Sequence, residues 1–99
     1  MARLRVAVLG LGEAGSAIAQ DLLLAGAEVV GFDPVPEKTV PGLLRAQSEA
    51  EAAEGASLVL SVNWARVARE VAEKVAPVLR PGQVYADLLS TRQNWGPPL

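Results

Sequence analysis

The sequence predicts an α/β domain with a doubly wound parallel sheet of about five strands, in three layers α/β/α. Short apolar, β-branched runs alternate with helical patterns along the chain. A glycine-rich turn joins the first of these runs to the first helical pattern. The length of 99 residues suits one small domain. For a doubly wound sheet we expect the strand order 3-2-1-4-5, with a ligand crevice outside the carboxyl ends of the strands.

The first third of the chain has the pattern of a strand, a helix and a second strand. The apolar run Leu4 to Leu9 predicts the first strand. A small and aliphatic face at helical spacing predicts a helix that packs on the sheet and comprises Ala14, Ala17, Ile18, Leu22, Leu24 and Ala25. Gly26 stands where a left-handed C-cap ends many helices, and Ala27 to Phe32 predicts the second strand.

Between the first strand and this helix the sequence reads G-L-G-E-A-G, with glycines at positions 10, 12 and 15. A pyrophosphate binds where backbone N–H groups point outward and no side chain blocks its approach, and a glycine turn at a helix N-terminus supplies both. We expect Gly10 to permit the tight turn, Gly12 to let the phosphates come close and Gly15 to let the helix pack against the strand. The alternative is that these glycines serve packing alone.

An acidic residue ends the predicted second strand, as in Rossmann-like dinucleotide-binding units. The carboxylate of Asp33 can accept hydrogen bonds from both hydroxyls of an adenosine ribose and would repel a 2′-phosphate, which favours NAD over NADP. Pro34 follows it and joins the cofactor-binding candidates, although an Asp before a proline is also a common turn former. Glu13 is expected to face solvent, because it would otherwise repel a phosphate.

The middle of the chain is irregular and then resumes the alternation. Closely spaced prolines and glycine over residues 34–42 leave no room for a full second crossover helix, and a short strand is predicted near Leu43 to Gln47. Ser48 to Glu51 has the form of a capping box, which predicts a short helix ending at Gly55. Leu58 to Val62 reads as a buried strand.

The last third predicts one more helix and one more strand. From Trp64 to Leu79 an amphipathic pattern places four valines on one face: Val67, Val71, Val75 and Val78. Pro81 and Gly82 form a turn, and Gln83 to Asp87 is the last strand. The four loops at the carboxyl ends would then line one rim, with residues 10–14 and 33–36 at the adenosine diphosphate half and 62–64 and 87–91 at the nicotinamide half.

Composition excludes several function classes. The 9 basic and 11 acidic residues and the isoelectric point near 5.0 give no basic surface for nucleic acid or an anionic membrane. Without cysteine or histidine there is no thiol nucleophile, thiolate metal site or imidazole base, and no metal site is predicted. The apolar runs are too short to span a membrane, and no signal peptide precedes the first strand, so a cytoplasmic protein is expected.

Four stretches, at residues 5–19, 29–34, 53–62 and 79–88, resemble the N-terminal NAD(P)-binding domain of the β-hydroxyacid dehydrogenases. This family includes 3-hydroxyisobutyrate dehydrogenase and 6-phosphogluconate dehydrogenase. The resemblance spans residues 3–91, so we assign 1–91 to the Rossmann domain and 92–99 to a C-terminal tail.

The resemblance implies roles for particular residues. Family residues around the pyrophosphate match Gly10, Leu11, Gly12, Glu13 and Ala14. The acid that meets the adenosine ribose matches Asp33, and the loop bordering the nicotinamide ribose matches Val62 and Asn63. The family's substrate-binding stretch after the last strand matches Ser90 and Thr91, although the proline expected there is missing.

In the family, the catalytic lysine and its companion asparagine come from a large C-terminal helical domain, which this sequence lacks. Lys38 and Lys74 are the only lysines, and neither has a setting that suits an acid/base, so no catalytic residue is assigned. We therefore expect a truncated oxidoreductase that binds NAD, or NADP, and is inactive alone. The alternative is a non-catalytic, stand-alone dinucleotide-binding or sensing module. Under either reading we expect a homo-oligomer or a partner chain to cover the C-terminal side.

Overall fold

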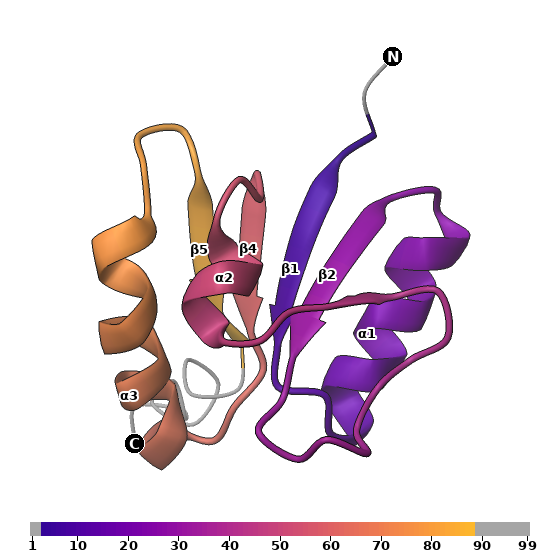
Figure 1. Ribbon diagram of the computed structural model, residues 1–99, viewed down its shortest axis with the longest axis horizontal. Helices are drawn as coiled ribbons and strands as arrows, with labels where there is room; N and C mark the ends of the chain where they lie inside the picture. The colour runs from indigo at the N-terminus through magenta and orange to yellow at the C-terminus, as the bar shows by residue number, and fades with distance from the viewer. Residues whose placement is uncertain (1–2, 89–99) are drawn as a thin grey trace, which may run out of the picture.

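The computed structural model describes residues 3–88 as one parallel five-stranded sheet with the order β3-β2-β1-β4-β5 (Figure 1). The strands are β1 (Arg5–Leu9), β2 (Glu28–Phe32), β3 (Leu44–Arg45), β4 (Leu58–Ser61) and β5 (Val84–Asp87). The predicted α/β class and strand order are confirmed. The carboxyl ends of β1, β2 and β4 point to the lower edge of Figure 1, and helices α1 and α3 begin at that same edge.

Helices cover the two faces of the sheet and give three layers. Helix α1 (Glu13–Leu24) packs on one face, whereas α2 (Glu49–Ala53) and α3 (Ala65–Val75) pack on the other. Alternate residues of β1 enter the two cores: Ala7 and Leu9 face α2 and α3, and Val6 and Val8 face α1. A central parallel strand is buried on both faces, which explains why β1 reads as an unbroken apolar run.

Helix α1 ends as its sequence predicts. Gly26 has a φ of +94°, a left-handed conformation that a side chain disfavours. Its N–H donates to the carbonyl of Leu23 at 3.1 Å, and the N–H of Ala27 donates to Leu22 at 3.0 Å. This pair of bonds satisfies carbonyls at the helix end and directs the chain into β2.

The capping box predicted at the start of α2 forms, but one of its two hydrogen bonds has a different partner. The hydroxyl of Ser48 accepts the N–H of Glu51 at 3.1 Å, as expected. The Glu51 carboxylate, however, accepts the N–H of Gln47 at 2.6 Å rather than that of Ser48. The Glu51 side chain therefore binds Gln47, the residue before the N-cap, and fixes the direction in which the chain enters α2.

The connection between β2 and β3 has no helix, as the prolines predict, and β3 is two residues long rather than five. Arg45 on β3 holds this connection in place. Its guanidinium donates to the carbonyls of Lys38 at 2.6 Å, of Val35 at 3.3 Å and of Asp33. The same group lies 5.8 Å from the centre of the Phe32 ring. One side chain thus anchors the loop where a crossover helix would otherwise stand.

Helix α3 differs from its prediction at both ends. It starts at Ala65, and a 3-10 turn over Ala76–Val78 replaces its last part, because the Pro77 ring cannot continue an α-helix. Val71 and Val75 are buried, and Val78 packs against the same core. Val67 lines the same cavity as Val71, but it is 40% exposed and lies outside the buried core.

Gln83 ties the end of α2 to the start of β5. Its side-chain amide donates to the carbonyls of Ala53 at 2.9 Å and Ala56 at 2.7 Å, and its oxygen accepts the N–H of Arg80 at 2.7 Å. We expect Gln83→Ala to lower the free energy of unfolding by about 2 kcal/mol, because it leaves several backbone groups without a partner. Urea denaturation measures this loss. A matched change on the exposed side of α1, Gln20→Ala, should stay within about 0.5 kcal/mol of wild type, and equal losses in both would contradict the prediction.

Among residues 3–88, no helix is both long enough and apolar enough to cross a bilayer.

Candidate functional site

The glycine turn between β1 and α1 is closed by backbone that lies far away in sequence. Gly10 has a φ of +100°, and its N–H donates to the carbonyl of Phe32 at 2.9 Å. A Cβ atom at Gly10 would lie 2.6 Å from the carbonyl oxygen of Val62 and 2.7 Å from Oδ1 of Asn63. Both the left-handed conformation and the lack of space therefore require glycine here.

The other two glycines of the motif have opposite surroundings. A Cβ atom at Gly15 would lie 1.8 Å from the carbonyl oxygen of Gly10, so the first turn of α1 packs directly on the glycine turn. A Cβ atom at Gly12 would have no protein atom within 4 Å, and its φ of −72° suits any residue. Gly12 thus leaves open space in front of the helix.

Backbone donors face that open space. The first hydrogen bond of α1 runs from the N–H of Ser16 to the carbonyl of Gly12 at 2.9 Å. The N–H groups of residues 13–15 precede it and have no acceptor within the helix. Unpaired N–H groups and the positive end of the helix dipole favour an anion at this point.

Asp33 connects the glycine turn to the end of β2. Its side chain is only 7% exposed. One carboxylate oxygen accepts the N–H of Leu11 at 2.8 Å, and the other accepts the N–H of Val35 at 2.8 Å. Each carboxylate oxygen can accept a second hydrogen bond, so the group both shapes the turn and keeps acceptor capacity.

Asn63 fixes the opposite wall of the turn, where the chain leaves β4. Its amide donates to the carbonyl of Leu9 and to the hydroxyl of Ser61, both at 3.1 Å. The N–H of Val62 donates to the same Leu9 carbonyl at 2.8 Å. On the neighbouring strand β5, burial raises the pKa of the Tyr85 hydroxyl above its ordinary value.

The residues at this edge line two cavities. The first, which we call the turn cavity, has a volume of about 460 Å³. Its lining comprises Gly12, Glu13, Ala14, Gly15, Lys38, Val62 and Trp64. The second, the strand-end cavity, has a volume of about 190 Å³. It is lined by the ends of β1 and β2 and by the two helices on that face, including Phe32, Asp33, Pro34, Glu49, Asn63, Val67 and Val71.

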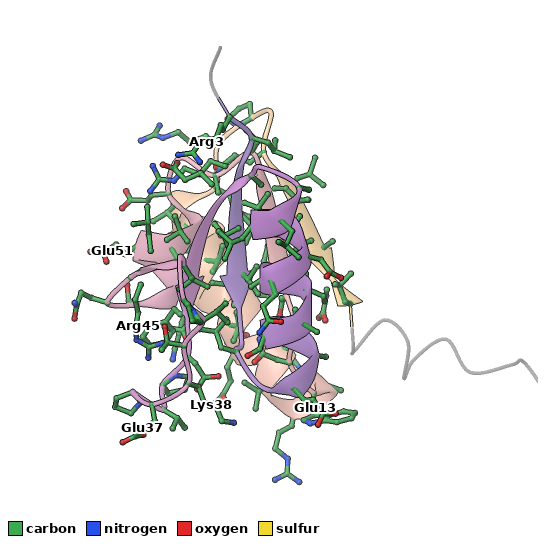
Figure 2. All side chains as sticks on the ribbon, turned by 90° about the vertical axis from the view of Figure 1, so that its right-hand side faces the viewer. Arg3, Glu13, Glu37, Lys38, Arg45 and Glu51 are labelled. Carbon is green, nitrogen blue, oxygen red and sulfur yellow. The ribbon has the colours of Figure 1, made fainter. Side chains whose placement is uncertain are left out.

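The sequence-predicted residues therefore come together at one edge, apart from those that lie outside the described range. Glu13 is exposed, as expected. Figure 2 shows it at the same end of the molecule as Glu37 and Lys38, which belong to the loop after β2. The predicted substrate-side residues Ser90 and Thr91, and the tail 92–99, lie outside residues 3–88.

Sequence reasoning missed several residues that line the two cavities: Phe32, Lys38, Glu49, Val67 and Val71. The helical period of the two valines indicated only a buried face. Glu49 carried only the signal of a capping box, and Lys38 only that of an exposed loop. Nothing in their local sequence pointed to a ligand.

A parallel sheet, an open glycine turn at a helix N-terminus and a buried acid at the end of the second strand together define a dinucleotide-binding domain of the Rossmann type. Residues 5–94 match the NAD binding domain of 6-phosphogluconate dehydrogenase, and the chain belongs to this family. Among curated protein sequences, none matches the chain significantly.

Solved structures agree with this assignment. The chain is similar to 3-hydroxyisobutyrate dehydrogenase from Mycobacterium tuberculosis, with 29% identity and a TM-score of 0.80 over 87% of this chain and 31% of that one. Pyrroline carboxylate reductase from Plasmodium falciparum, solved with NADP bound, shares the fold at 20% identity and a TM-score of 0.76. The match covers 87% of this chain and 33% of that one. Prephenate dehydrogenase from A. aeolicus, solved with NAD+, also shares the fold, with 21% identity and a TM-score of 0.73. The match covers 88% of this chain and 34% of that one. The chain thus spans about a third of each of these structures.

Proposed function

We propose that this chain is the NAD(P)-binding domain of a β-hydroxyacid dehydrogenase-like oxidoreductase, of the 3-hydroxyisobutyrate or 6-phosphogluconate dehydrogenase type. The open space in front of Gly12, faced by N–H groups of α1, carries the proposal, because a phosphate group needs that combination. Family membership supports it. The nicotinamide cofactor would supply the hydride chemistry, and this chain would bind and orient it.

The proposed contacts follow the predicted residues. The pyrophosphate would lie against the backbone of residues 10–15, with the Lys38 ammonium on the same cavity wall as a counter-charge. Asp33 would accept the adenosine ribose hydroxyls with its remaining lone pairs, beside Pro34. Val62 and Asn63 would border the nicotinamide ribose. A negative carboxylate at Asp33 disfavours a 2′-phosphate, so NAD is the proposed cofactor and NADP the second candidate.

The acid/base of a dehydrogenase reaction would come from outside residues 3–88. Lys74 lies 3.9 Å from the carboxylate of Glu49 and is 62% exposed, and Lys38 is exposed in its loop. Exposed ammonium groups of this kind lack the buried setting that suits a lysine for acid/base catalysis. We propose that a C-terminal helical domain or a partner chain supplies the catalytic groups, with Ser90 and Thr91 on the substrate side.

A partner or second copy is also proposed at the β5 side of the sheet. Within the described range, α1 packs against β1 and β2, and apolar side chains of β5 and its end on that side stay exposed: Val84 is 56% and Leu88 37% exposed. Apolar surface of this kind favours association. The cytoplasmic location and the alternative of a stand-alone sensing module stay predictions of the sequence.

Calorimetric titration of the purified chain with NADH, and in parallel with NADPH, tests the proposed function. We expect wild type to bind NADH with a dissociation constant in the micromolar range and NADPH more weakly. Gly12→Ala should keep the melting temperature, because its Cβ meets no protein atom within 4 Å, but should weaken NADH binding at least about tenfold by filling the space that a phosphate needs. Failure of wild type to bind either dinucleotide, or unchanged binding by Gly12→Ala, would contradict the proposal.

A further inference from the structure

The strand-end cavity is small and is lined mainly by apolar residues. Its lining includes Phe32 and Pro34 at the end of β2, and Val67 and Val71 on α3. Its volume of about 190 Å³ is less than half that of the turn cavity. A mostly apolar lining with a small number of polar groups is typical of sites that bury the apolar or aromatic part of a ligand.

Most polar side chains at this cavity are already engaged. The Asp33 carboxylate accepts the N–H groups of Leu11 and Val35, and the Asn63 amide donates to Leu9 and Ser61. These hydrogen bonds fix the backbone around the cavity. Besides Asp33, the one charged side chain that the described residues contribute to the lining is that of Glu49.

Glu49 is held at the cavity without a hydrogen bond to the rest of the described chain. Its side chain is only 12% exposed. The nearest cation is Lys74 on α3, whose Nζ lies 3.9 Å from Oε2 of Glu49, which is too long for a hydrogen bond. Within residues 3–88 the carboxylate accepts no other bond. A carboxylate can only accept hydrogen bonds, so a ligand group that meets Glu49 in this cavity would be a donor.

We infer that Glu49 accepts a hydrogen bond from the exocyclic amino group of an adenine ring seated in the strand-end cavity, and so selects adenine among purines. The inference rests on the proposed function, since the ring would belong to the bound dinucleotide. Asp33 accepts the N–H of Leu11 in the glycine turn and also lines the strand-end cavity, beside Pro34. A base in this cavity would therefore lie next to a ribose that Asp33 holds. A purine with a carbonyl oxygen at the same ring position would turn a lone pair toward the carboxylate, which is unfavourable.

A purely structural role for Glu49 makes a different prediction. If the residue served only to join α2 to α3 through Lys74, removal of either partner would have the same effect, and neither would depend on the base of the ligand. Lys74 is 62% exposed and is absent from the cavity lining. Lys74→Met is therefore the matched control, because it removes the ion pair and leaves the cavity intact.

Binding of NADH and of reduced nicotinamide hypoxanthine dinucleotide, measured by calorimetry, tests the inference. The second dinucleotide carries a carbonyl oxygen in place of the adenine amino group. We expect wild type to prefer NADH by about tenfold or more, the usual effect of one hydrogen bond to a charged group. Glu49→Met should bring the ratio of the two dissociation constants close to one, mainly by weakening NADH, whereas Lys74→Met should keep the wild-type ratio. Glu49→Gln retains one acceptor oxygen and should give an intermediate ratio of the two dissociation constants. This variant tests the inference if Glu49→Met does not fold.

The outcomes separate the two proposals. An unchanged ratio in the Glu49 variants, or an equal fall in Lys74→Met, would overturn the inference while leaving dinucleotide binding intact. Absence of binding of both dinucleotides to wild type would instead overturn the proposed function, and the inference with it.

Discussion

Gly15→Ala should destabilise the fold by about 3 kcal/mol or more and abolish dinucleotide binding. The new Cβ would lie 1.8 Å from the carbonyl oxygen of Gly10 and 2.9 Å from its carbonyl carbon. Both are backbone atoms, so relief requires α1 to move away from the glycine turn. Helix propensity alone favours alanine over glycine by about 1 kcal/mol, so a net loss measures the clash. Urea denaturation and calorimetric titration with NADH measure the two effects.

Gly12→Ala is the natural comparison, three residues earlier in the same motif. It adds the same methyl group where no protein atom lies within 4 Å. Unlike Gly15→Ala, this variant should keep an unfolding free energy within about 0.5 kcal/mol of wild type, while its dinucleotide binding is weakened. A Gly15→Ala protein as stable as wild type would show that α1 does not pack on the turn as described.

Asp33→Ala is expected to cost about 2–3 kcal/mol of unfolding free energy and to weaken NADH binding at least about tenfold. The substitution leaves the N–H of Leu11 without its acceptor at a site where Leu11 is 2% exposed, and frees the N–H of Val35 as well. The glycine turn would then lose its tie to β2. Chemical denaturation gives the stability, and parallel titrations with NADH and NADPH give the affinities.

Asp33→Asn separates the two roles of this carboxylate. It keeps one acceptor oxygen for the backbone but removes the negative charge. We expect it to be more stable than Asp33→Ala and to narrow the difference between NADH and NADPH affinity. Should Asp33→Ala keep both its stability and its preference for NADH, the hydrogen bonds to Leu11 and Val35 would have no energetic role, and the basis for NAD selection would be wrong.

The fold was open to prediction because its determinants are local. Strands buried on both faces read as unbroken apolar runs, and Gly26 and the Ser48–Glu51 box mark helix ends by their own chemistry. The glycine motif was readable because the φ of +100° at Gly10 and the contact of Gly15 with Gly10 belong to the turn itself, although Val62 and Asn63 also limit the space at Gly10. Even the missing crossover helix followed from closely spaced prolines.

The rest depends on contacts between residues that are far apart in sequence. Arg45 could not be recognised as the anchor of the Asp33–Lys38 loop, because its three carbonyl partners are set by how the loop folds back. Glu49 looked like part of a helix cap, and only the packing of α2 beside α3 brings it to a cavity. Val67 shares the period of the core valines, but it lies at the first turn of α3, where the helix reaches past the core.

The wall of the glycine turn has a consequence for the order in which this domain forms. The carbonyl of Leu9 receives the Val62 N–H and the Asn63 amide, the latter across 54 positions of sequence. A growing chain that has emerged only as far as β3 holds all three glycines and Asp33, yet it has no wall behind Gly10. The nucleotide site therefore comes into existence only when β4 inserts beside β1. A ligand that binds only the folded state would then favour that step, by binding the sheet once β4 is in place.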